Sequence, residues 1–517
     1  MKLFKVLAFV ALAALLAPSH AQITKPDENQ QPSLSHLMTT IHDLCTPEFE
    51  GRLAGTDAYM SATDYVIDKL QDYGVEPYQG DWLQLFQIER NQIEDANFYT
   101  YLNDNDTRKR YVLGKDFCCA GMTGRGYANA NVVFCGYGID NAGFNEYKNV
   151  DAQGKIVVVL SGTPNFLPST ITKQYSTIRD KAHVAKNHGA CALVVINMSK
   201  TCPANEVQGK VFDGDKPHLA KFPILKATRA CAESFFEGEK MAFQTAVDSI
   251  NNSRTPQSFH FLKFFEMDVN ARYQPQALTA NVVGIRPGDD KRLKDEYIVV
   301  GAHLDHVGMH GNTCLFPGAD DNASGVAVLL ETARMMNEAY IHPRRSVIFV
   351  LFSGSETENL GSEVFVTNFS PLRRIEAFIN IECVGTGDSL VAMGNNMFPD
   401  LYQIACDMDS AYLDYSLCRG YKTNPNGDAA AFAAIGIPSL VVTNYNGNRR
   451  VHVPSDIPEN IDRQFLLKAA KLTYETAYEL TFGDYQGRTF DSKRTRFVDD
   501  NAAPAKKKKK SSSKKKK

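Results

Sequence analysis

Beyond residue 279, short apolar runs alternate with longer segments in which apolar residues recur at helical spacing. Apolar strands that alternate with amphipathic helices predict a mostly parallel sheet covered by helices on both faces. The expected strands are 297–300, 347–352, 377–381 and 439–442, and the expected helices are 324–336 and 463–480. The predicted fold class is therefore α/β, with a mainly parallel mixed sheet between helix layers.

The middle of the chain follows a different pattern, which predicts a second domain. Strands are expected at 130–137, 154–160 and 192–196, and a helix at 181–189. A chain of 517 residues is also too long for one ordinary domain. We expect a small β-rich domain inserted into a larger one, whose first helices lie between residues 33 and 73.

The start of the chain has the build of a secretory signal. Lys2 and Lys5 precede the apolar run 6–16, and 19–21 is a small-x-small cleavage site. Export to the periplasm or out of the cell is expected, with a buried N-terminal helix as the alternative. The predicted division is 1–21 signal peptide, 22–34 leader, 35–124 first part of the larger domain, 125–270 inserted domain, 271–485 remainder of the larger domain and 486–517 disordered tail.

The charge of the chain is concentrated at its end. Removing the nine tail lysines from the 56 basic residues leaves 47 against 59 acidic residues, a net charge near −12. The rest of the chain is acidic and has no motif that recognises nucleotide bases, which argues against a nucleic-acid partner. The Lys-rich tail either attaches to an anionic surface or is a solvated segment without a specific role. No later stretch reaches about 18 unbroken apolar residues, so no membrane span is expected.

Metal-competent side chains follow the expected strands in a regular order. His303 and Glu356 come after the first two strands, Glu382 and His452 follow the later ones, and Asp320 precedes the helix 324–336. Ligands bind beyond the carboxyl ends of strands in open α/β sheets. Each residue alone is an ordinary loop residue or helix cap, but five in this order predict a zinc site of nitrogen and oxygen ligands.

Five motifs carry a resemblance to a known family. GAHLDH, GADDNASGVAVLLE, SGSETENLGS, NIECVG and HVPSD resemble the co-catalytic zinc aminopeptidases, which include secreted leucine-type aminopeptidases and glutamate carboxypeptidase II relatives. EFEGRLAGT also looks like that family, and GKIVVVL with KAHVAKNHGACALVVI resembles the protease-associated domain inserted in it. The resemblance covers about residues 35–480.

The resemblance implies two zinc ions and a role for each ligand. His303 would bind one ion, Asp320 would bridge both, and Glu382 would complete the first position. Glu356 and His452 would bind the second ion. The resemblance also implies a cis peptide bond between Asp320 and Asp321, and a hydrogen bond from His303 to the carboxylate of Asp305.

Two positions depart from the family pattern. Ser355 stands where the family has its general-base glutamate, and a hydroxyl is a poor base near neutral pH. Glu358 is a candidate substitute base, two residues beyond Glu356. Glu382 stands where the family usually has aspartate, which keeps the charge and adds one methylene.

Four further side chains near these motifs have weaker interpretations. His306 and His310 are expected to be exposed loop histidines outside the ligand set. Asp428 either supports the site by hydrogen bonding or caps a loop. Cys314 is a disulfide partner or a free thiol; the chain holds 11 cysteines, an odd number, and none lies in a CxxC pair that would suggest a zinc knuckle.

The predicted function is an exported zinc-dependent exopeptidase that removes N-terminal residues from peptides through metal-activated water. Turnover is expected to be reduced by Ser355. One alternative is an inactive peptidase-fold protein that binds peptides or surface partners. Another is an activity like that of glutaminyl cyclases, which the inserted domain disfavours. No GxSxG serine motif or phosphate loop supports a different chemistry.

Overall fold

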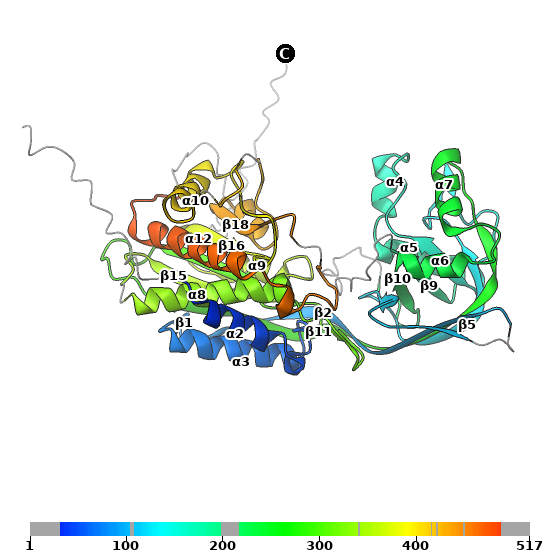
Figure 1. The fold of residues 1–517 in the computed structure, drawn as a ribbon, viewed down its shortest axis with the longest axis horizontal. Coiled ribbons are helices and arrows are strands. Elements are labelled where there is room, and N and C mark those ends of the chain that lie inside the picture. Colours follow the sequence, from blue (N-terminus) through cyan, green and yellow to red (C-terminus); the bar gives the residue numbers. More distant parts are fainter. Residues whose placement is uncertain are drawn as a thin grey trace, which may run out of the picture.

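The computed structural model describes residues 31–103, 108–197, 217–339, 342–414, 416–419, 422–447 and 450–487. Two lobes are joined by a long twisted pair of strands (Figure 1). The predicted signal peptide, Cys202 and nearly all of the Lys-rich tail lie outside the described residues. None of the described helices combines the length and the apolar character that a bilayer span requires.

The larger lobe contains the mixed sheet expected from the sequence. Its described strands run in the order β17-β18-β16-β12-β15-β11. The bounds are β11 Phe259–Arg286, β12 Tyr297–His303, β15 Ser346–Phe352, β16 Ile375–Ile381, β17 Ser389–Met393 and β18 Ser439–Tyr445. The central strands β18, β16, β12 and β15 are parallel, whereas β17 and β11 are antiparallel to their neighbours. The α/β fold class is confirmed.

Helices pack on both faces of this sheet. One face is covered by α2 (Leu34–Leu44), α3 (Asp57–Asp72), α8 (Ser324–Glu338), α10 (Pro399–Tyr412) and α12 (Arg463–Phe482). The other face is covered by α9 (Leu360–Asn368) and α11 (Ala429–Ala434). The sequence sets where several of them begin, because Ser33, Thr56 and Asp462 accept hydrogen bonds from the first backbone N–H groups of α2, α3 and α12.

The smaller lobe has its own core, and its strands continue the sheet of the larger lobe through β11. Its strands are β4 Phe117–Cys119, β5 Gly126–Phe134, β8 Ile156–Leu160, β9 Ala192–Ile196 and β10 Ile224–Ala227, in the order β11-β5-β8-β9-β10-β4. Its helices are α4 Ser169–Gln174, α5 Ile178–Asn187, α6 Arg229–Phe236 and α7 Phe243–Ser253. Phe98 packs its ring against Phe117, Phe235 and Phe265 in this core.

The strand pair that joins the lobes was not expected from the sequence. Strand β2 (Leu83–Tyr101) pairs with β11 from Leu83 opposite Val282 to Tyr101 opposite Phe264. The register shifts between Gln274 and Ala277, which marks an irregularity within the ribbon. Strand β11 runs through residue 270 without a break, so no helix or strand ends at the domain boundary predicted there. The division into domains at this residue stays a prediction.

Short elements complete the described chain. They are β1 Glu76–Pro77, β3 Lys109–Tyr111, β6 Asp140–Asn141, β7 Phe144–Asn145, β13 Met309–His310 and β14 Cys314–Leu315, with the helical turns η1 Pro47–Phe49, η2 Ala319–Ala323, η3 Leu372–Arg374 and η4 Pro458–Asn460. Strand β13 pairs with β2 at Ile93. The loop that follows β12 therefore contacts the ribbon between the lobes.

Candidate metal centre

The carboxyl ends of the parallel strands hold the predicted metal-competent side chains. His303 is the last residue of β12, Glu356 follows β15, and Glu382 follows β16. His452 lies in the loop after β18, with its backbone at a left-handed φ of 57°. These four side chains line a cavity of about 210 Å³ together with Asp321, Ser355, Asn359, Cys383, Asp428 and Val451.

Asp321 lies between the two histidines of this cavity. Its Oδ1 is 3.3 Å from His303 Nε2, and its Oδ2 is 3.3 Å from His452 Nε2. His452 Nε2 is also 2.8 Å from Glu356 Oε2. Burial alone would raise the pKa of Asp321, but the hydrogen bonds from His303 and His452 hold it well below its ordinary value. One carboxylate therefore faces both histidines, as a bridging ligand would.

The bridging role predicted for Asp320 is corrected by this geometry. The Asp320 carboxylate turns away from the cavity and accepts hydrogen bonds from Gly385 N at 2.7 Å and from the Thr386 hydroxyl. The cis peptide bond joins Asp321 to Asn322, one bond later than expected. The backbone amides of Asp320 and Asp321 both donate to Asp456, which fixes the turn so that the two side chains point in different directions.

His306 is buried beside the same cluster, contrary to the expectation of an exposed loop residue. Its side chain has no exposed surface, and its Nδ1 lies 3.1 Å from Glu356 Oε1 and 3.7 Å from Asp321 Oδ2. His306, Asp321, Glu356 and His452 offer four donor atoms that all lie within 4.8 Å of one another. The ring is buried because its backbone N–H bonds to the carbonyl of Arg52, which ties this loop to the N-terminal segment.

His310 is also buried, so the expectation of exposure is wrong for it too. Its ring packs edge-on against Phe316, with centroids 5.0 Å apart, away from the cluster. Burial lowers its pKa to about 4. Cys314, next to it across the β13–β14 pair, is a free and buried thiol rather than a disulfide partner.

Asp305 supports the site in a different way from the one predicted. His303 Nδ1 lies 3.0 Å from the backbone carbonyl of Asp305 but 3.9 Å from its carboxylate, which is too far for a hydrogen bond. The carboxylate instead accepts from the backbone amides of Ser355 at 3.2 Å and Glu356 at 3.3 Å. Asp305 thereby holds the loop after β15 against the loop after β12.

The Ser355 hydroxyl faces a buried carboxylate. Ser355 Oγ donates to Asp428 Oδ2 at 2.8 Å, and Asp428 Oδ1 has no hydrogen-bond partner among the described residues. Burial raises the pKa of Asp428. Asp428 is therefore a hydrogen-bonding partner inside the cavity, the first of its two predicted interpretations. Glu358 is exposed and is not among the side chains that line the cavity.

The donor set fits a cationic group. In the described part of the chain, no lysine or arginine forms an ion pair with Asp321, Glu356, Glu382 or Asp428, although the first two and Asp428 are buried and Glu382 is half-buried beside them. Burial raises the pKa of Glu382 to about 7. Several buried carboxylates gathered in one place cost several kcal/mol each unless a cation neutralises them. Imidazole and carboxylate together are ligands typical of Zn²⁺.

A segment near the N-terminus positions the site loops. The fully buried Arg52 guanidinium donates to the carbonyls of Leu304 at 2.9 Å, Pro317 at 2.7 Å and Gly318 at 3.0 Å. It also bonds Leu44 O at the end of α2. EFEGRLAGT lies within the family resemblance, but its sequence carries no signal for this function, because three of the four carbonyl partners lie more than 250 residues away.

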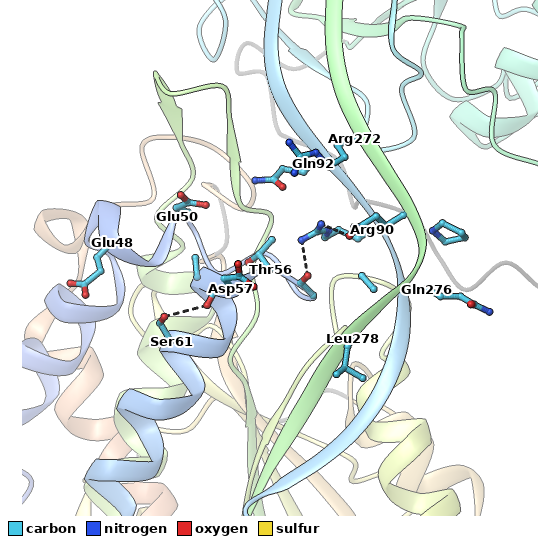
Figure 2. Close-up of a pocket in the computed structure, with 15 residues that line it drawn as sticks. Glu48, Glu50, Thr56, Asp57, Ser61, Arg90, Gln92, Arg272, Gln276 and Leu278 are labelled. Atoms are coloured by element: carbon cyan, nitrogen blue, oxygen red, sulfur yellow. Dashed lines mark hydrogen bonds between the residues drawn. The ribbon is translucent and has the colours of Figure 1, made fainter.

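A second and larger hollow lies between the start of α3 and the ribbon. It has a volume of about 1020 Å³ (Figure 2). Glu48, Glu50 and Asp57 line the helical side, whereas Arg90 and Arg272 project from the strands. No histidine or cysteine lines it. Its walls therefore provide charge but not the mixed nitrogen and oxygen donors of the smaller cavity.

Known families match both lobes. Residues 281–477 match Peptidase family M28, and residues 127–234 match the PA domain. These two matches support the resemblance to zinc aminopeptidases with an inserted PA domain. The metal-competent residues of the larger lobe all fall within the first of these two matches.

Individual relatives agree with this family. A "Probable leucine aminopeptidase" of Arthroderma benhamiae is 28% identical over 213 residues, which span 39% of this chain and 58% of the relative. An aminopeptidase from Aneurinibacillus sp. strain AM-1 has a TM-score of 0.62 at 20% identity, over 89% of this chain and 97% of that one. A zinc aminopeptidase from Bacillus subtilis has a TM-score of 0.61 at 19% identity, over 87% and 95%. The two structures establish a shared fold.

Proposed function

We propose that this protein is an exported, zinc-dependent aminopeptidase-like hydrolase that acts on the N-terminal residues of peptides. The observation that carries the proposal is the cluster of histidines and carboxylates at the carboxyl ends of β12, β15 and β16, with no lysine or arginine paired to its carboxylates among the described residues. Export is proposed from the apolar leader in the sequence.

The cluster would hold two zinc ions. His303, Asp321 and Glu382 would provide one position, and His452 and Glu356 the other, with Asp321 shared between them. When bound, zinc supplies Lewis-acid chemistry that polarises a carbonyl group and makes water more acidic. Asp305 would keep the loops after β12 and β15 in place during the reaction.

Hydrolysis adds water across the peptide bond, so a base must accept a proton from water and the leaving amine must receive one. By the family resemblance Ser355 stands at the position of that base, and its hydroxyl donates a hydrogen bond to Asp428. A serine hydroxyl does not accept the proton near neutral pH. Loss of general-base assistance typically lowers the rate by a factor of about 10²–10⁴. We therefore propose turnover well below that of ordinary peptidases.

A second candidate function follows from the same residue. With Ser355 in place, the scaffold retains its metal-competent residues but lacks the base, which favours a protein that binds peptides without cleaving them. The Lys-rich tail, outside the described residues, would attach such a protein to an anionic surface.

The deciding experiment measures zinc content and hydrolysis on the same sample of full-length protein. The substrates are a panel of aminoacyl-arylamides and dipeptides. Bound zinc with slow, N-terminal cleavage supports the hydrolase. Bound zinc without cleavage supports the peptide-binding candidate, and a protein that holds no zinc after loading contradicts both. N-terminal sequencing of exported protein that does not begin at Gln22 would contradict the proposed signal cleavage.

A further inference from the structure

The two metal positions of the cluster are unequal, because His306 stands beside one of them. His306 Nδ1 points at the carboxylates of Glu356 and Asp321, at 3.1 Å and 3.7 Å. The rings of His306 and His452 lie with their centroids 5.4 Å apart, and both flank Glu356. The assignment made from the sequence leaves His306 out of this position.

The separations among the four donors suit direct coordination. Zinc bonded at about 2.0–2.2 Å in a tetrahedron places its donor atoms about 3.3–3.6 Å apart. The measured separations are 2.8 Å from His452 Nε2 to Glu356 Oε2 and 3.1 Å from His306 Nδ1 to Glu356 Oε1. The same two nitrogen atoms lie 3.3 Å and 3.7 Å from Asp321 Oδ2. Small adjustments of side chains would bring these atoms around one ion.

The surroundings of His306 keep its ring in this place. Its backbone bridges to Leu53, and its N–H bonds to the Arg52 carbonyl. A Cβ at Gly318 would lie 2.6 Å from Cδ2 of the ring, so the glycine leaves the space that the imidazole occupies. His306 is fully buried and does not line the open cavity, whereas the other five candidate ligands, His303, Asp321, Glu356, Glu382 and His452, do.

We propose that His306 is a fourth protein ligand of the second metal position, together with Asp321, Glu356 and His452. This inference rests on the metal centre of the proposed function. Four protein ligands close a zinc site, whereas three leave a position open for water or substrate. The position held by His303, Asp321 and Glu382 is therefore the open one, and it faces the cavity.

The direct test uses full-length protein labelled with ¹⁵N-histidine and loaded with two equivalents of ¹¹³Cd²⁺. Scalar coupling to cadmium is expected on His306 Nδ1 as well as on the Nε2 atoms of His303 and His452. Coupling on His303 and His452 without coupling on His306 would overturn the proposal and leave the metal centre intact. Coupling on none of the three would contradict the metal centre itself.

A pair of variants separates coordination from simple hydrogen bonding. In His306→Asn the side-chain amide can still donate to Glu356, but it is a poor zinc ligand. We expect zinc affinity at one position to fall further than the factor of about 10–100 that loss of an outer-shell partner costs. Retained affinity would show that His306 only orients Glu356. His310→Asn, another buried histidine outside the cluster, is the matched control and should leave both affinities unchanged.

Discussion

At the scale of single residues, the chemistry of the cavity depends on which atoms of neighbouring side chains face it. Asp321 faces both His303 and His452, whereas Asp320 faces the loop after β16. Ser355 faces Asp428. Hydrogen bonds in the loops set the direction of each of these side chains. Substitutions at adjacent positions should therefore have different effects.

Replacing Ser355 by glutamate should restore a base. The new carboxylate would lie beside Asp428, and two carboxylates in contact share a proton, which raises the pKa of one of them toward neutrality. We expect kcat to rise by a factor of about 10²–10⁴ with little change in bound zinc. The measurement is steady-state hydrolysis of an aminoacyl-arylamide. Ser355→Ala is the control, and a rate increase of the same size in that variant would refute the argument.

Exchanging the two adjacent aspartates for asparagine should separate their roles. Asp321→Asn is expected to weaken zinc binding by at least about 100-fold, because a shared ligand is lost. Asp320→Asn should retain zinc but lower the free energy of unfolding by about 1–3 kcal/mol, because its hydrogen bonds to Gly385 and Thr386 are weakened. Zinc titration and urea unfolding measure the two effects. Equal zinc loss in both variants would contradict the geometry.

At the scale of elements, helices and strands bring distant loops into register through buried polar groups. Arg52 joins the end of α2 to the loops after β12 and before η2. In the smaller lobe, Glu146 has a similar function. Its Oε2 accepts from the backbone amides of Tyr137 at 2.9 Å and Ile139 at 3.0 Å, and this fixes the loop after β5.

Glu146 makes the stability of the smaller lobe depend on pH. Burial raises its pKa from 4.5 to about 7. Between these values the folded state holds a proton that the unfolded state has lost, so stability decreases as pH rises through this window. The decrease should be on the order of 3 kcal/mol. Glu146→Gln should flatten the pH profile of urea unfolding between pH 4.5 and 7.

The control for Glu146 is Glu233→Gln on α6 in the same lobe. Glu233 forms an exposed pair with Arg229 on its own helix, so the substitution should leave the slope as in wild type. A pH slope that persists in Glu146→Gln would show that another group carries the titration.

At the scale of the whole molecule, two cores are connected by one ribbon. The core of the larger lobe and the core around Phe98 share no buried residues, although β11 contributes residues to both cores. Contact between the lobes continues in a small cluster that joins Cys118 on β4 to Val307, Cys314 and Phe316 in the loop beyond the site. The loop that carries His306 therefore packs directly against the smaller lobe.

Separate cores predict separate unfolding. Phe98→Ala removes a ring that contacts Phe117, Phe235 and Phe265, and should destabilise the smaller lobe by about 3–5 kcal/mol. Scanning calorimetry should show two unfolding transitions, and Phe98→Ala should lower the midpoint temperature of only one of them. Phe349→Ala, in the core of the larger lobe, should move the other. A single transition that both substitutions shift equally would mean that the ribbon makes the lobes one cooperative unit.

Much of the fold followed from the local pattern of the sequence. The run 347–352 is apolar throughout and 377–381 is apolar except for Asn380, because parallel strands are buried on both faces, and the runs became β15 and β16 within two residues. Because the buried strands could be located in this way, the order of the candidate metal ligands at their ends could also be predicted. The ribbon of β2 and β11 could not be predicted, because each half-exposed strand pairs with a partner that lies more than 160 residues away in the sequence.

The sequence by itself determined the α/β class, the inserted lobe and the strand ends at which the candidate ligands gather, since hydrophobic periodicity reports burial locally. Only the tertiary structure decided that Asp321 rather than Asp320 faces the histidines and that His306 is buried beside Glu356. The direction of a loop side chain is set by hydrogen bonds from distant groups, here Asp456 and Arg52, and no local pattern encodes those contacts.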